Sequence, residues 1–290
     1  MPRWTEALPE FDLPATPQRL DELPSPMPGV VEAFRAHLPA GKFLLFCSSA
    51  PLPLAFEATL FELLAEARYP APRPRRARGG TAMAKLSAPG TAATCYGWPA
   101  GEELAPAKAT QPQLLELGRL LARLHHLGET HPAKVADCAD AAALLLRVEA
   151  GPTREKLEAV LVSPLAPLPS GAVHGGLRPG RALFIGERCS AVLPSGLACF
   201  GPLVLDLAES AVGFLAGAPR PAAVLRAVVS GYQSLRRLLP EEVEALPAVL
   251  RLAAAREGAR RAAMGREMAL VALEGVLGMP DGEIRAAAGG

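Results

Sequence analysis

The most chemically suggestive stretch of this 290-residue chain is His174-Gly175-Gly176, a histidine followed by two glycines. In an α/β-hydrolase such a segment supplies backbone N–H groups to an oxyanion, and the nucleophile lies in a G-x-S-x-G turn. No serine of this chain has that sequence around it. We therefore reject an α/β-hydrolase active site, and the segment needs another explanation.

The cysteines and the other histidines do not have the spacing of a metal site. The chain has no C-x-x-C pair, and its five cysteines are scattered, at Cys47, Cys95, Cys138, Cys189 and Cys199. We expect them to be buried as small apolar side chains in a reducing compartment. His125 and His126 fall at the end of a predicted helix, where capping or packing is favoured over catalysis.

The overall composition is that of a globular protein without a strong electrostatic field. Half of the residues are hydrophobic, a fifth are charged, and the formal net charge is +1. A chain with so little net charge is not drawn to nucleic acid or to anionic lipid. No apolar run reaches the ~20 residues of a membrane helix, and the start does not resemble a secretory signal. We expect a cytoplasmic protein that binds neither nucleic acid nor membranes.

The first hundred residues predict a small lobe that contains β-structure. Seven prolines fall within residues 1–28 and each removes a backbone donor, so we expect an extended N-terminal arm there. A short helix is predicted from Gly29 to Leu38. The apolar spacing then predicts a strand, a helix and a second strand, at Lys42–Cys47, Pro53–Ala67 and Thr91–Tyr96.

The remainder, residues 102–290, predicts a mostly helical lobe. The turn-rich segment Gly97–Gly101 marks a hinge, so that residues 29–101 make up the small lobe. Leucines recur with helical period from Gln111 to His126. Short strands are expected in the middle of the helical lobe, near Gly171–His174, Ala182–Ile185 and Ser190–Leu193.

The segment from Gly171 to Ala208 resembles the catalytic loop, metal-binding strand and following helix of bacterial homoserine kinases of the aminoglycoside phosphotransferase type. In that family the loop is H-G-D-x-x-x-x-N, and a later strand ends in an aspartate that precedes an Asp-Leu-Ala helix start. The chain retains His174, Pro179 and Asp206 of this pattern. Further matches in the family's order extend over roughly residues 42–260. The resemblance implies an α+β, two-lobed, protein-kinase-like fold.

The departures from the family motif fall on its chemistry. Kinase-type transfer uses one carboxylate to orient the acceptor hydroxyl, and an amide with a second carboxylate to hold magnesium. At the three corresponding positions this chain has Gly176, Arg181 and Pro194, which we expect to converge on one cleft. The region ahead of Lys42, where the family has a phosphate-covering hairpin, is rich in proline, and no phosphate cradle is expected there. Lys42 precedes its predicted strand, so we do not assign it the family's phosphate-pairing role.

We therefore expect a kinase-like pseudoenzyme without phosphotransferase activity, which acts by binding or regulation, needs no cofactor, and has an unknown protein or a small anionic ligand as its partner. The alternative is an active phosphotransferase for a homoserine-like substrate that uses ATP, magnesium and displaced residues such as Asp206 or Glu187. Arg178 and Arg181, with Arg188 nearby, would bring cationic groups to the cleft, where they could bind a small anion without magnesium. The other interpretation of these arginines is that they face solvent.

Overall fold

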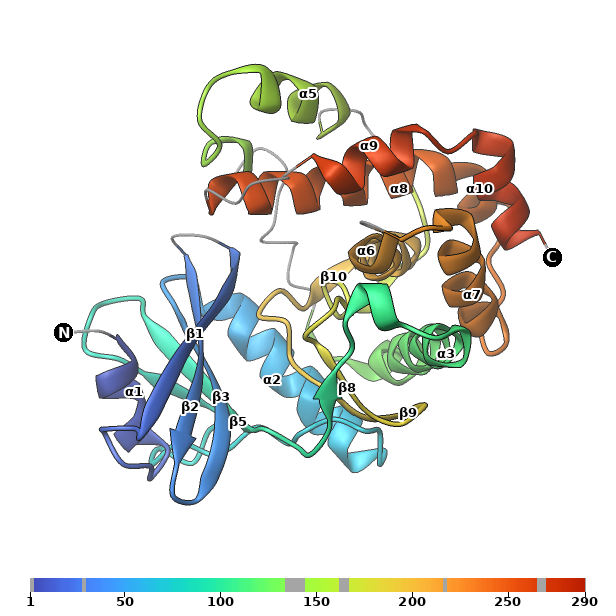
Figure 1. Ribbon diagram of the computed structural model, residues 1–290. Helices are drawn as coiled ribbons and strands as arrows, with labels where there is room; N and C mark the ends of the chain where they lie inside the picture. Colours follow the sequence, from blue (N-terminus) through green and yellow to red (C-terminus); the bar gives the residue numbers. More distant parts are fainter. Residues whose placement is uncertain are drawn as a thin grey trace.

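The chain folds into a lobe built on an antiparallel sheet and a larger lobe of helices (Figure 1). The structure is a computed structural model and describes residues 3–27, 30–133, 144–161, 167–215, 218–264 and 270–289. The elements of the sheet lobe are α1 (Arg3–Glu10), β1 (Arg19–Met27), β2 (Val31–Leu38), β3 (Gly41–Ser48), α2 (Pro51–Glu66), β4 (Met83–Lys85) and β5 (Ala92–Gly97).

The helical lobe also contains short strands and two 3₁₀ turns. Its strands are β6 (Glu102–Glu103), β7 (Ser170–Val173), β8 (Ala182–Ile185), β9 (Arg188–Val192) and β10 (Cys199–Pro202), and its 3₁₀ turns are Pro106–Lys108 and Gly128–Thr130. Its helices are α3 (Gln111–Leu127), α5 (Pro152–Leu161), α6 (Leu203–Leu215), α7 (Pro221–Gln233), α8 (Pro240–Ala263), α9 (Val271–Leu277) and α10 (Asp281–Ala288).

The five strands of the small lobe run in the order β1-β2-β3-β5-β4, and each neighbouring pair is antiparallel. The two strands expected at Lys42–Cys47 and Thr91–Tyr96 are adjacent in this sheet, with Phe46 opposite Thr94. This part of the sequence prediction is confirmed. The hinge assigned to Gly97–Gly101 stays a prediction.

The sheet is buried on both faces because its strands alternate apolar side chains. On one face Phe34, Leu45 and their neighbours pack against Leu8 and Phe11, from α1 and the turn after it. On the other face Phe46 belongs to the main core, which continues through α2 into the helical lobe. One continuous core therefore fixes the sheet relative to the helical lobe.

The extended arm predicted for residues 1–28 is wrong over its described part. Residues 3–10 form α1, with Pro9 inside the helix, and residues 19–27 form β1. Proline is tolerated here because β1 is the edge strand of the sheet, and because its register with β2 shifts between Leu23 and Met27, around Pro24 and Pro26. The prolines therefore mark an edge strand and a bulge.

The helix predicted from Gly29 to Leu38 is also wrong, because residues 31–38 form β2. Val31 and Ala33 belong to the main core, whereas Phe34, Ala36 and Leu38 pack on the opposite face of the sheet. This two-residue alternation is the pattern of a strand. A β1–β2 hairpin therefore does precede Lys42, which lies exposed near the start of β3.

The helical lobe matches the sequence prediction closely. The expected helix from Gln111 is α3, and Thr110 and Gln113 form a capping box at its start. The three expected short strands are β7, β8 and β9. None of the described helices has both the length and the apolar character needed to cross a bilayer. Cys47, Cys95, Cys189 and Cys199 are buried, as expected, and Cys138 lies outside the described residues.

Candidate functional site

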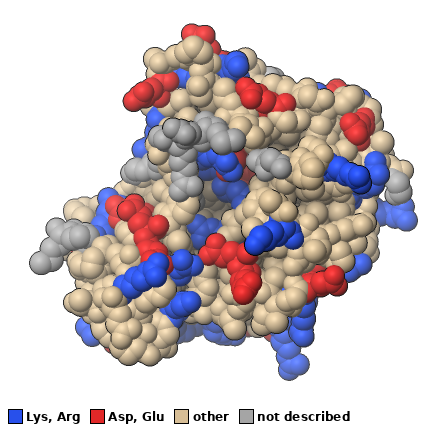
Figure 2. All heavy atoms as spheres, viewed as in Figure 1, with Lys and Arg blue, Asp and Glu red and all other residues tan. Residues whose placement is uncertain are grey.

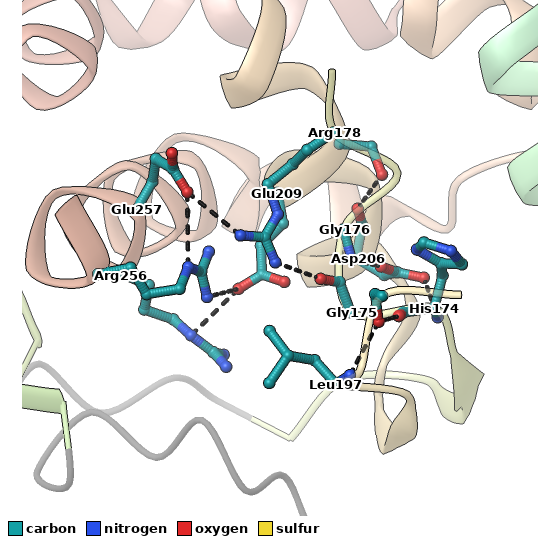
Figure 3. Close-up of polar contacts among 12 residues, drawn as sticks. His174, Gly175, Gly176, Arg178, Leu197, Asp206, Glu209, Arg256 and Glu257 are labelled. Atoms are coloured by element: carbon teal, nitrogen blue, oxygen red, sulfur yellow. Dashed lines mark hydrogen bonds and ion pairs between the residues drawn. The ribbon is translucent and has the colours of Figure 1, made fainter. Parts of the chain in front are cut away.

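A buried aspartate at the start of α6 organises the loop that follows β7. Asp206, which is 2% exposed, accepts hydrogen bonds from the backbone N–H groups of His174 and Gly176, each at 2.7 Å. His125 Nε2 donates to the same carboxylate at 2.9 Å, and its Nδ1 lies 2.7 Å from the Tyr232 hydroxyl. Burial opposes ionisation, but the hydrogen bonds from His125 and from the backbone outweigh it and lower the pKa of Asp206. The carboxylate therefore holds the loop in place (Figure 3).

His174 connects this loop to the segment after β9. Its Nε2–H donates to the Leu193 carbonyl at 2.8 Å, and its own carbonyl oxygen accepts from Ser195 Oγ at 2.5 Å. Complete burial lowers the pKa of His174, so the imidazole is neutral and acts as a donor through Nε2. These contacts bring the neighbours of Pro194 against the loop that contains Gly176.

At Gly176, where the resemblance places the family's catalytic aspartate, a side chain would be strained and would require Arg178 to move. Its backbone φ is +94°, a conformation that residues with a Cβ rarely adopt. A Cβ added there would lie 2.8 Å from Arg178 Nε and 3.2 Å from Glu209 Cβ. The Arg178 side chain thus occupies the space that a side chain at Gly176 would need.

Arg181 and Pro194, at the family's two metal-ligand positions, also come close to the loop. The Leu193 N–H donates to the Arg181 carbonyl at 2.8 Å, directly before Pro194. The Arg181 guanidinium carbon lies 5.5 Å from the ring centroid of Phe46, which is fully buried in β3. Burial lowers the pKa of Arg181, while Glu57 and Glu103 act in the opposite direction. A cation resting on an aromatic face is a stable arrangement without any ligand.

A buried glutamate of α2 holds the residues after Pro194. Glu57 Oε1 accepts hydrogen bonds from the N–H groups of Ser195 at 2.9 Å and Gly196 at 2.8 Å. Burial raises the pKa of Glu57, although these donors and Arg181 act in the opposite direction. Glu57 therefore ties the small lobe to the segment after β9 through contacts inside the protein.

A cavity of about 260 Å³ lies between the lobes. The β1–β2 hairpin, the segment after β5, the loop from Arg178 to Arg181, and α8 all contribute to its walls. In the space-filling view basic side chains are visible deep in the hollow between the lobes (Figure 2). The charged residues in the described lining are Glu103, Arg178, Arg181, Glu257, Arg260 and Arg261.

Two lining residues on the sheet side, Trp98 and Glu103, are in contact with an arginine that is not itself in the described lining. The guanidinium of Arg35, on the face of β2 that carries Val31 and Ala33, lies 4.9 Å from the ring centroid of Trp98. Its Nη1 donates to Glu103 Oε1 at 3.0 Å. Arg35 therefore rests on an aromatic ring, as Arg181 does.

The residues expected from the sequence divide into two groups. Arg178, Pro179 and Arg181 line the cavity, and Asp206 braces the loop from beneath. Gly176 and Pro194 are not among the described lining residues, although each is next to or near one that is. Arg188 and Glu187 are exposed at the β8–β9 turn and are not among the described lining residues.

Several site residues were missed from the sequence, and most of these lie on α8. Glu257, Arg260 and Arg261 reach the cavity from this helix, and Glu57 and Phe46 come from the small lobe. The available signal was a cluster of charges at helical spacing in an alanine-rich helix, because residues three or four apart share one face.

Comparisons with known proteins agree with this architecture. Residues 33–246 match the phosphotransferase enzyme family. A homoserine kinase of Rhodopseudomonas palustris is 30% identical over 243 residues, which cover 76% of this chain and 72% of that protein. A homoserine kinase of Acidiphilium cryptum is 29% identical over 224 residues, covering 71% of this chain and 68% of that protein.

Solved structures with much lower identity share the fold. An amicoumacin kinase superposes with a TM-score of 0.68 at 12% identity, over 93% of this chain and 89% of that one. A microcompartment-associated aminopropanol kinase gives 0.61 at 17% identity, over 98% and 92%. The chain belongs to the phosphotransferase enzyme family, and it has the kinase-like α+β fold of that family.

Proposed function

We propose that this family member does not transfer phosphate and acts instead as a kinase-like protein that binds or regulates. One observation carries the proposal: the cleft offers guanidinium groups where phosphoryl transfer needs carboxylate and amide oxygens. The two carboxylates of the described cavity lining are already paired, Glu103 with Arg35 at 3.0 Å and Glu257 with Arg261 at 2.8 Å. Neither is free to hold magnesium.

The geometry around the three substituted positions supports the same conclusion. A carboxylate at Gly176 would be strained and would displace Arg178, Arg181 is stacked on Phe46, and the residues after Pro194 are held by Glu57. A cavity of about 260 Å³ is small for a nucleotide, since pockets for drug-sized ligands measure ~300–1,000 Å³. We infer that the contacts inside the protein replace those made by Mg-ATP in an active kinase.

The alternative is phosphoryl transfer to a homoserine-like acceptor, and the homoserine kinase relatives favour it. It requires a displaced carboxylate. Asp206 is fully engaged by three hydrogen bonds beneath the loop, and Glu187 is exposed at a turn outside the described cavity lining. The hydrogen bonds of Asp206 and the exposed position of Glu187 both weigh against this alternative.

A phosphotransfer assay with ATP, magnesium and homoserine tests the proposal. We expect no turnover above a heat-inactivated control, and no magnesium-dependent binding in a nucleotide titration. The triple variant Gly176→Asp, Arg181→Asn, Pro194→Asp should also give little activity, because no phosphate-covering loop is expected in the proline-rich region ahead of Lys42 and all these groups act as a unit. Magnesium-dependent turnover by the unmodified protein would support the alternative and refute the proposal.

The remaining expectations belong to the same proposal. We place the protein in the cytoplasm, which agrees with free thiols at Cys47, Cys95 and Cys189. The proposed partner is a second protein or a small anion, and nucleic acid is not expected to bind a chain with a net charge of +1.

A further inference from the structure

The cavity between the lobes contains more positive charge than its own carboxylates neutralise. Its described lining carries four arginines, Arg178, Arg181, Arg260 and Arg261, against the two glutamates Glu103 and Glu257. Glu103 is also paired with Arg35, which is not part of the described lining. Behind this wall, Glu209 lies 3.1 Å from Arg256 and adds no net negative charge. The described lining therefore has an excess of two positive charges.

Arg260 is the residue whose burial is hardest to explain without a ligand. Its side chain is 2% exposed, and its Nε, Nη1 and Nη2 have no hydrogen-bond acceptor in the described structure. The nearest carboxylate oxygens are 3.5 Å from Nε, on Glu257, and 3.9 Å from Nη1, on Glu209. A guanidinium carries five N–H donors, and burying them without acceptors is costly.

Arg178 adds a second incompletely satisfied guanidinium to the same wall. Its Nη2 donates to the Gly175 carbonyl at 2.6 Å and its Nη1 lies 3.3 Å from Glu257 Oε2, but its buried Nε has no hydrogen-bond partner in the described residues. Burial and the neighbouring Arg178 charge lower the pKa of Arg260 to about 10. It remains charged at neutral pH, so both cations face one small space.

We propose that this cavity binds a phosphate group, either free or carried by a small organic molecule, through Arg260 and Arg178 with help from Arg181 and Arg261. The inference rests on the proposed binding role and names its ligand class. A phosphate dianion matches the excess of two positive charges, and its oxygens suit the planar donor fork of arginine. The volume of about 260 Å³ limits the ligand to a small molecule.

Glu257 allows a prediction about the sign of a change in phosphate affinity. Its carboxylate pairs with Arg178, Arg260 and Arg261, and the three arginines help to lower its pKa to about 2, so it is ionised. It therefore competes with an incoming anion for the same guanidinium groups. Removing its charge should strengthen phosphate binding, an effect that a purely structural ion-pair network does not predict.

The test is calorimetric titration with inorganic phosphate and, separately, glycerol 3-phosphate, in buffer with a chelator and matched ionic strength. We expect saturable binding without magnesium, at least tenfold weaker for Arg260→Met and severalfold tighter for Glu257→Gln. Arg260→Met is expected to fold, because no buried carboxylate is left unpaired: Glu257 keeps Arg178 and Arg261, and Glu209 keeps Arg256. Arg251→Met is the matched control: it lies on the same helix and pairs with Asp281 outside the cavity.

The outcomes separate this inference from the proposed function. Tight binding of glycerol 3-phosphate alone identifies an organic phosphate as the ligand, and equal binding of both probes identifies the phosphate group itself. Absence of saturable phosphate binding to the wild-type protein overturns the inference even if no kinase activity is found. Phosphate binding that is unchanged in both Arg260→Met and Glu257→Gln overturns it as well. Phosphotransfer activity would refute the proposed function while leaving the anion site standing.

Discussion

Replacing Asp206 by alanine should destabilise the protein strongly, because it removes one acceptor that serves three donors. The N–H groups of His174 and Gly176 and the Nε2 of His125 would all lose their partner in a site where Asp206 is 2% exposed. Each unsatisfied buried polar group costs about 1–3 kcal/mol. Allowing for partial relaxation, we expect the free energy of unfolding to fall by about 3–6 kcal/mol.

Urea unfolding followed by circular dichroism measures this loss directly. A domain is stable by only about 5–15 kcal/mol, so the midpoint should move far enough to be unambiguous. The control is Glu129→Ala, which removes an exposed carboxylate from its pair with His126, a contact worth about 0–1 kcal/mol. The two variants differ in burial and in the number of donors left without an acceptor.

The result bears on function as well as on stability. If Asp206 were a displaced catalytic base, its loss would abolish activity while stability changed little. A loss below about 1 kcal/mol for Asp206→Ala would therefore refute the bracing role and reopen the alternative function.

Three further predictions concern other parts of the molecule. A Cβ at Gly231 would lie 2.0 Å from the Leu115 carbonyl oxygen, so Gly231→Ala should cost at least about 2 kcal/mol in urea unfolding, whereas Gly275→Ala, in open space, should gain up to about 1 kcal/mol. Burial raises the pKa of Glu57 above 4.5, so its ionisation lowers the stability of the wild-type protein as pH rises. Glu57→Gln lacks this ionisation, and its melting temperature should therefore rise relative to that of the wild type between about pH 4 and about pH 8. Gly176→Ala should lower thermal stability by about 1–3 kcal/mol because φ is +94° there, and an unchanged melting temperature would contradict that conformation.

The helical lobe could be predicted from the sequence because its signals are local. Leucines at helical spacing locate α3, and Pro240 followed by Glu241 and Glu242 locates the start of α8. The loop after β7 was recognised from its histidine and glycines. These features depend on residues close together in the chain, where periodicity and capping act directly.

The start of the chain could not be predicted in the same way, because its structure depends on distant partners. Pro24 and Pro26 disfavour a central strand, but the position of β1 at the sheet edge and its register shift near Leu23 admit them. The segment 31–38 was assigned to a helix although its burial alternates as in a strand. Only pairing with β3, which is itself held by β5, decides between the two.

Only part of the site could be predicted from the sequence, because its residues also come from distant parts of the chain. The loop motif identified Arg178 and Arg181, but the guanidinium that lacks acceptors, Arg260, comes from a helix about eighty residues later. Charges in an alanine-rich helix usually indicate an exposed face. Here the charges at the end of α8 are buried because this helix packs against α6 under the loop (Figure 1).

The residues around the three family positions make contacts within the protein, and these contacts are the basis for proposing that the cleft binds a different ligand. In this protein Arg181 rests on Phe46, Glu57 engages the segment after Pro194, and Arg178 fills the space beside Gly176. The buried nitrogens without acceptors in the described cavity wall belong to arginines, Arg178 and Arg260. A cleft whose unsatisfied hydrogen-bond donors are cationic side chains has the chemistry of an anion site.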